Sequence, residues 1–224
     1  MQCAIVELRQ YTLHPGRRDE LIELFEREFL EAQEAAGMAL IGQFRVRGKD
    51  DRFVWLRGFE DMQSRAASLA AFYDGPVWAA HRAAANATMI DSNNVLLLRP
   101  ARADSGFCVC ESFPSGSEAP SGRAYVAGLH SLRESAREDD LARVESAIAP
   151  GVNSARGSIL AWHVSEHSPN SFPRLPVREG ENVVVWFARF PDASSADACL
   201  AAQPTEFERA VTLRLIPTLR SRLR

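Results

Sequence analysis

The sequence predicts an α+β protein in which two tandem βαββαβ units form one antiparallel barrel with helices outside. The first observation is a repeat: segments 54–61 and 185–192 share the pattern Val-Trp-x-x-x-Phe-x-Asp at a constant offset of 131 residues, which indicates one supersecondary unit built twice. The second is that runs of period two and runs of helical period follow each other in the same order in both copies. The third is physical: a βαββαβ sheet carries both helices on one side, so its bare face needs the other copy as cover.

The elements of the first copy follow from periodicity and from the residues that interrupt it. Gly37 is suited to end a long helix, because glycine readily adopts the left-handed conformation at that position. Residues 48–51 form a turn between two strands, Asp61 is suited to cap a short helix, and the break Asp74-Gly75-Pro76 begins another helix. The predicted elements are a strand at 4–12, a helix at 17–36, strands at 38–47 and 52–59, helices at 61–71 and 77–90, and a strand at 94–99.

The second copy repeats this order with an insertion. The offset between matching residues is 118 to 120 before its hairpin and 131 after it, so about 13 residues are inserted within 165–182, a segment rich in Ser, Pro, Gly and Asn. A helix is predicted at 203–223, where Phe207 corresponds to Trp78, so the last strand is expected to be short or missing. The predicted domains are a first repeat at 1–100, a linker at 101–122 that contains an additional strand at 107–113, and a second, divergent repeat at 123–224.

Composition places the chain among globular proteins and excludes some classes of partner. It is 46% hydrophobic with a net charge of −3, so nucleic-acid binding through phosphate neutralisation is not expected. No long apolar run or leader is present, and we therefore expect a cytoplasmic protein without a membrane segment. Metal ions and cofactors are not expected, because the cysteines lack zinc-site spacing. Free, buried thiols are predicted at Cys3, Cys108, Cys110 and Cys199.

Five segments of the first copy resemble a known family. They are Glu7-Leu8-Arg9-Gln10-Tyr11 with a Pro-Gly-Arg helix start, Phe72-Tyr73-Asp74-Gly75-Pro76-Val77-Trp78, His81-Arg82, Asn86-Ala87-Thr88-Met89-Ile90, and Asn94-Val95-Leu96-Leu97-Leu98-Arg99-Pro100. The chain is similar here to the NIPSNAP family of the dimeric α/β-barrel (ferredoxin-like) superfamily. The resemblance implies the fold. The superfamily holds cofactorless monooxygenases, lactone isomerases and haem-dependent enzymes, and NIPSNAP members have no agreed reaction, although some are linked to mitochondria and vesicle traffic. Function therefore has to be argued from a site.

The strongest candidate site is a set of polar residues on alternating strand positions, predicted to face the barrel interior. Polar groups on a covered face are costly unless they are paired. Two interpretations stand: the charged residues satisfy one another as a structural network, or the excess of arginine receives an anionic or carbonyl-bearing ligand between aromatic walls. The second copy is less polar at the corresponding positions, which favours one pocket. The residues are Glu7, Arg9, Tyr11, Gln43, Arg45, Trp55 and Arg57.

Histidines provide weaker candidates. His81 lies on the predicted helix after Gly75, either as a packing or surface residue or as a general base; Tyr11 is the other candidate for proton transfer. His163 and His167 are four residues apart, but they straddle a strand end and a loop, so the helical geometry of a zinc site is missing.

The sequence supports two functional hypotheses. In the first, the protein binds or converts a small polar organic molecule in the barrel interior, with Glu7, Arg9, Arg45, Trp55 and Arg57 as substrate-binding residues. In the second, it is a non-catalytic interaction module with a filled barrel core. Edge strands and helix faces remain available in either case, and a homo-oligomer is compatible with both. The sequence does not decide whether the protein is an enzyme.

Overall fold

The protein is described by a computed structural model over residues 3–107, 122–202 and 210–223. These residues form a closed antiparallel barrel with the strand order β1-β3-β2-β8-β5-β7-β6-β4, as predicted. The first half of the barrel comprises β1 (Ile5–Leu13), β2 (Ala39–Val46), β3 (Lys49–Phe59) and β4 (Met89–Pro100). The second half comprises β5 (Ala124–Ser131), β6 (Ser158–Ser165), β7 (Val183–Phe190) and β8 (Ala210–Pro217).

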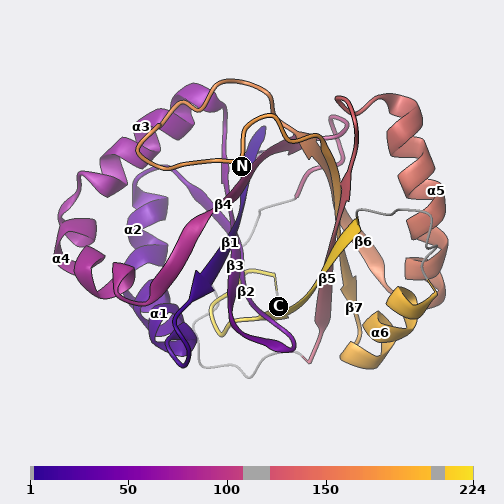
Figure 1. Cartoon of the computed structure of the whole chain (residues 1–224), viewed down its shortest axis with the longest axis horizontal. Coiled ribbons are helices and arrows are strands. Elements are labelled where there is room, and N and C mark those ends of the chain that lie inside the picture. Colours follow the sequence, from indigo (N-terminus) through magenta and orange to yellow (C-terminus); the bar gives the residue numbers. More distant parts are fainter. Residues whose placement is uncertain (1–2, 108–121, 203–209, 224) are drawn as a thin grey trace.

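Helices cover the outside of both halves (Figure 1). Those of the first half are α1 (Arg18–Leu24), a π-helical turn (η1, Phe25–Phe29), α2 (Leu30–Ala35), α3 (Met62–Tyr73) and α4 (Pro76–Asn86), and those of the second half are α5 (Glu138–Ser154) and α6 (Ala193–Ala201). The predicted cap of α3 is confirmed, since Asp61 Oδ1 accepts a hydrogen bond from Ser64 N at 2.6 Å. The same bond recurs at α6, from Ser195 N to Asp192 Oδ1 at 2.7 Å. None of the described helices is long and apolar enough to cross a membrane.

Strand register confirms the internal repeat residue by residue. In the first half Glu7 lies opposite Arg57 and Arg9 lies opposite Trp55. In the second half the matching pairs are Val126 with Ala188 and Gly128 with Trp186. The two halves meet along short seams: three residue pairs join β2 to β8, and three join β4 to β6.

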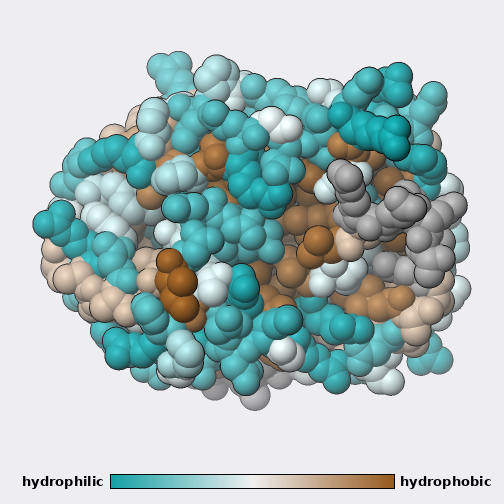
Figure 2. All heavy atoms as spheres, in the orientation of Figure 1, coloured by the Kyte–Doolittle hydropathy of each residue, from teal (hydrophilic) through white to brown (hydrophobic). Residues whose placement is uncertain are grey.

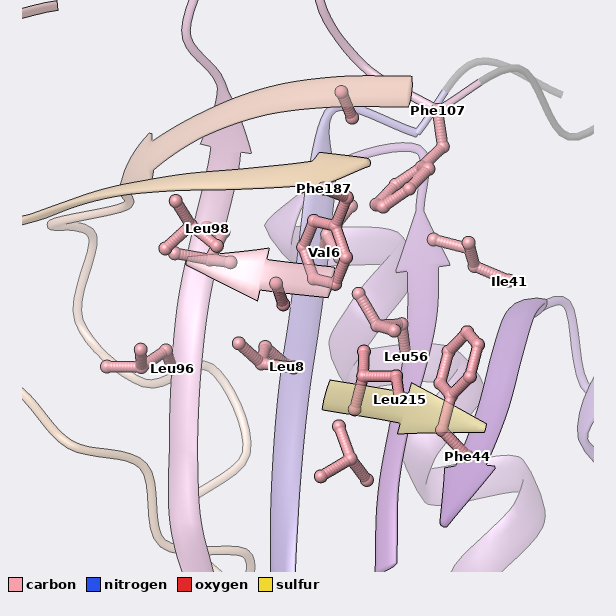
Figure 3. Packing of buried hydrophobic residues seen from close by; sticks show 14 of the residues in the cluster. Val6, Leu8, Ile41, Phe44, Leu56, Leu96, Leu98, Phe107, Phe187 and Leu215 are labelled. Carbon is pink, nitrogen blue, oxygen red and sulfur yellow. The ribbon is translucent and has the colours of Figure 1, made fainter. Parts of the chain in front are cut away.

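Apolar side chains from both halves fill the barrel interior. Val6, Leu8 and Leu56 of the first half lie in one buried cluster with Phe187 and Leu215 of the second, and Figure 3 shows these side chains pointing toward one another. At about 25 cal/mol per Å² of apolar area removed from water, this burial between the halves is the main force that closes the barrel.

The face assignment made from the sequence is therefore wrong. Strand alternation places the predicted polar set on the opposite face, in the layer between the first-half sheet and its helices, where Trp55 packs with Phe25 of η1 and other helix residues. Both faces of this sheet are buried, so burial by itself does not indicate which one faces the second half. The face that lies against the second half is the uniformly apolar one, because the second half offers mostly apolar side chains there. The misassigned residues are Glu7, Arg9, Tyr11, Gln43, Arg45, Trp55 and Arg57.

Several boundary predictions also need correction. The helix predicted at 77–90 ends at Asn86, and β4 already begins at Met89. The helix predicted at 203–223 is wrong over 210–217, where β8 pairs with both β5 and β2. The last strand of the second copy is therefore present, and residues 221–223 are not part of it.

Some predictions extend beyond the described residues. Phe107 is buried outside any strand, and 108–113, the rest of the additional strand predicted there, lies outside the described part, as do Phe207, Cys108 and Cys110. Cys3 and Cys199 are buried and are not in disulfides, as predicted.

Candidate functional site

A buried carboxylate in β1 organises the polar layer between the first-half sheet and its helices. Glu7 is 0% exposed. Its Oε2 accepts hydrogen bonds from Arg9 Nη1 at 2.6 Å and from Arg57 Nε at 2.8 Å, and its Oε1 accepts one from Arg65 Nε at 2.7 Å. Arg9 comes from the same strand, Arg57 from β3 and Arg65 from α3. We call these four residues, Glu7, Arg9, Arg57 and Arg65, the buried arginine cluster.

The cluster keeps its carboxylate ionised. Although burial by itself raises the pKa of Glu7, the nearby guanidiniums, led by Arg57, outweigh it and hold the pKa well below its usual range. Burial lowers the pKa of Arg65, and its attraction to Glu7 only partly offsets this. One carboxylate thus faces three guanidiniums, which remain charged in proteins, and the cluster carries two surplus positive charges.

Aromatic rings form a wall beside these charges. The guanidinium carbons of Arg9 and Arg57 lie 5.4 and 5.0 Å from the ring centre of Trp55, within the range of cation–π attraction. The Tyr11 hydroxyl accepts a hydrogen bond from Arg9 Nε at 3.0 Å. Burial raises the pKa of Tyr11, so its phenol keeps a proton that can be donated.

The inserted segment of the second half covers the cluster. Residues 166–182, the connection between β6 and β7, reach across to α3 (Figure 1), where Arg65 Nη1 donates to Asn170 Oδ1 and to Ser171 Oγ, both at 3.0 Å. Phe172 packs against Tyr73, and Arg174 forms two hydrogen bonds with Asp74. The second half therefore contributes to the site through the segment that the sequence identified only as a loop insertion.

Several buried polar atoms in this layer have no hydrogen-bond partner among the described residues. They include both side-chain amide atoms of Gln43, the indole nitrogen of Trp55 and Nη2 of Arg57. Gln43 is paired with Trp55 across β2 and β3, so the two side chains share a face and a row of the sheet. Buried groups of this kind normally have a protein or water partner, so these three side chains on neighbouring strands are a candidate binding position.

Two predicted candidates lie elsewhere. Arg45 is partly exposed and bonds to Asp19 Oδ1 at 2.9 Å, so it does not join the cluster. His81 Nε2 lies 3.4 Å from Glu28 Oε2, and both side chains are partly exposed. Tyr11 is therefore the only one of the two proton-transfer candidates that contacts the cluster.

The other two histidines are also separated from each other. His163 is fully buried next to Phe107, whereas His167 contacts Ser135 at the surface. Within the three described ranges no group of three His, Cys, Asp or Glu side chains is arranged to hold a metal ion.

Arg65 and Gln33 are the residues that sequence reasoning missed. Gln33 Oε1 accepts a hydrogen bond from Arg57 Nη1 at 3.0 Å. Gln33 lies on α2 and Arg65 on α3, and their side chains are 1% and 0% exposed. The repeat itself carried a signal for Arg65: at the offset of 131 its counterpart is Ala196, just as the counterpart of Arg57 is Ala188. Both arginines are thus specific to the first copy.

The closed barrel with outer helices defines a protein of the dimeric α/β-barrel fold. A predicted monooxygenase from Lactobacillus acidophilus NCFM shares this fold, with a TM-score of 0.54 and 11% identity over 98% of both chains. A second predicted monooxygenase, from Fusobacterium nucleatum, has a TM-score of 0.55 and 9% identity over 97% of this chain and 94% of its own. At such identities the likeness concerns the fold alone.

Residues 6–103, a little under half of the chain, match the NIPSNAP family model. An uncharacterised NIPSNAP-like domain protein from Burkholderia xenovorans is 28% identical, with a TM-score of 0.43, over 48% of this chain and 94% of its own. No curated protein sequence matches the chain. The resemblance inferred from the sequence is confirmed. It indicates the fold and the family of the matched segment, but no reaction.

Proposed function

We propose that this NIPSNAP-type protein binds a small organic anion, with a carboxylate or an enolisable carbonyl, in the layer between the first-half sheet and its helices. The observation that carries the proposal is the charge imbalance of the buried arginine cluster, in which three guanidiniums share one carboxylate. Uncompensated charge in a buried place is costly. An anionic ligand would remove much of that cost, and this is a physical reason for the cluster to exist.

The unpartnered atoms indicate how such a ligand would be held. Arg57 Nη2 and Trp55 Nε1 are donors, and the Gln43 amide offers both a donor and an acceptor. A carboxylate can accept from the first two, while a neighbouring polar group of the ligand pairs with the amide. Tyr11 Oη already accepts from Arg9, so its hydrogen is free to be donated to a ligand oxygen. If the bound molecule is converted, Tyr11 is the group placed to supply a proton.

Thermal-shift measurements with small carboxylates, quinones and haem test the proposal, because a ligand that binds only the folded state raises the melting temperature. We expect a carboxylate of the panel to stabilise the native chain. Arg57→Lys keeps the charge but removes the planar fork, and should greatly reduce the shift. Arg45→Ala is a matched control outside the cluster and should leave the shift unchanged.

Gln43→Met separates binding from folding. The change keeps side-chain volume and removes two buried polar atoms that lack partners. Without ligand we expect the variant to be more stable by about 1 kcal/mol, while the ligand-induced shift falls. A variant that is less stable than the native chain, or that keeps the full ligand shift, would contradict the proposed role of Gln43.

The second candidate is the interaction module, and two observations favour it. The barrel interior is filled by apolar side chains. Large hydrophobic residues are also exposed, namely Ile90, Val211, Ile216 and Leu219. Figure 2 shows hydrophobic side chains gathered in the middle of one face, between the two helical layers. A flat response across the whole ligand panel would favour this candidate.

A further inference from the structure

A cavity lies at the seam between the two halves, apart from the buried arginine cluster. Its volume is about 290 Å³. The first half contributes Arg47, which follows β2. The second half contributes β5, the first turns of α6 and the end of β8, with Tyr125, Asp197 and Arg214 among the lining residues. None of the cluster residues lines it.

The polar wall of this cavity contains more cations than anions. Asp197 accepts from Arg47 Nη1 at 2.7 Å through Oδ2 and from Arg214 Nε at 2.9 Å through Oδ1. Arg123 is a third arginine of the lining. The side chains of Arg47 and Arg214 are 47% and 51% exposed, so both guanidiniums keep donors that a ligand entering from solvent can reach.

The remaining wall is apolar. It is formed by Ala124, Tyr125, Ala193, Ala196, Leu215 and Pro217. Ligand pockets commonly combine a mostly apolar lining with a few convergent polar groups, and this volume is close to the lower end of their usual range of about 300–1,000 Å³. The occupant that fits both walls is small, carries one negative charge and has a flat or compact apolar body.

We propose that the seam cavity is a binding site for a small aryl or cyclic monocarboxylate. The carboxylate would accept hydrogen bonds from Arg47 and Arg214, in a geometry for which guanidinium is well suited, and the apolar body would lie against Leu215 and Pro217. The backbone already joins the halves here, since Arg47 N donates to Arg214 O at 2.8 Å. A ligand held by both arginines therefore adds a second link across the seam.

Asp197 gives this proposal an unusual test, because it competes with the ligand for the same two guanidiniums. Calorimetric titration of the full chain with benzoate should show weak binding that falls with added salt. Asp197→Asn should tighten benzoate binding about tenfold, and Arg214→Ala should weaken it about tenfold or more. If these residues form only a structural ion-pair network, Asp197→Asn should not tighten benzoate binding and Arg214→Ala should not weaken it.

Matched controls separate the site from general charge effects. Asp74→Asn changes the net charge by the same amount and also frees an arginine, Arg174, but it lies outside the cavity and should leave the affinity unchanged. Gln43→Met acts in the polar layer of the first half, outside the seam cavity, and should also leave the seam affinity unchanged, so the two sites are distinguished. The proposal is overturned if Asp197→Asn does not tighten binding, if neither form binds benzoate, or if inorganic phosphate binds as tightly as benzoate.

Discussion

The two halves of the barrel share a backbone plan but differ in what they bury at equivalent places. In the first half the layer between sheet and helices holds Glu7 and three arginines. At the equivalent places the second half has small or apolar residues, namely Val126, Gly128, Ala188 and Ala196. All four charges are present in one copy and absent from the other. This indicates that they form one unit, since a single member without the rest would be a buried, unpaired charge.

Both layers contain a tryptophan at the equivalent position, but the two tryptophans have different neighbours. Trp55 lies beside Arg9 and has no partner for its indole nitrogen among the described residues. Trp186 Nε1 donates to His130 Nε2 at 2.9 Å. The second half has thus satisfied its tryptophan internally. In the first half the indole nitrogen of Trp55 has no partner among the described residues and is available to the proposed ligand.

The largest effect that can break this comparison is removal of the central carboxylate. Glu7→Gln leaves the shape of the cluster intact but removes the carboxylate charge that faces the three guanidiniums, so we expect a loss of about 3–5 kcal/mol in the free energy of unfolding. Urea denaturation measures it. A loss below about 1 kcal/mol for Glu7→Gln would mean that charge does not hold the cluster together.

The pH dependence of stability should also differ between the halves. Burial lowers the pKa of His130 and of His163, both in the second half, to about 4. Below about pH 6.5 the unfolded chain binds protons that the folded chain does not, so stability falls between pH 6.5 and 4, by about 2 kcal/mol for each histidine at pH 5. Glu7 has a lowered pKa, and the stability it contributes is lost only below about pH 4.5, where the unfolded carboxyl takes up its proton.

His163→Leu tests whether His163 contributes to this pH dependence of stability. Neither ring nitrogen of His163 has a partner in the described part of the chain, so the substitution breaks no hydrogen bond there. Urea denaturation at pH 7 and pH 5 should show a smaller difference for the variant than for the native chain. If the stability difference between pH 7 and pH 5 is the same in both proteins, the lowered pKa of His163 is wrong.

Sequence reasoning reached the barrel because its evidence was local or repeated. The matched tryptophan strands and the alternation of Val6 and Leu8 are visible within a few residues. The site depended on contacts between distant segments: Glu7 meets Arg65 across 58 residues, and Arg65 meets Asn170 across 105. No short-range pattern encodes such pairs.

The errors have the same origin. The polar face of β1 was assigned to the barrel interior because a buried strand gives no sign of which neighbour covers which face. The helix predicted over β8 followed the correspondence between Phe207 and Trp78, although Val211, Leu213 and Leu215 alternate with more polar neighbours as a strand does. The periodicity of residues 210–217 indicates their secondary structure better than their alignment with the first copy does.

The smallest effects come from glycines, and they test whether Trp186 fills the place that Arg9 holds in the first half. A Cβ added to Gly128 would lie 2.2 Å from Trp186 Nε1, so Gly128→Ala should cost about 1–3 kcal/mol through overpacking, measured as a fall in melting temperature. Gly151→Ala in α5 is the control. Its Cβ would meet only Cys199 Sγ at 3.8 Å, and the change should stabilise the helix by about 0.5–1 kcal/mol. If both alanines stabilise the protein, the indole of Trp186 moves easily, and the two halves differ less in packing than the strand register implies.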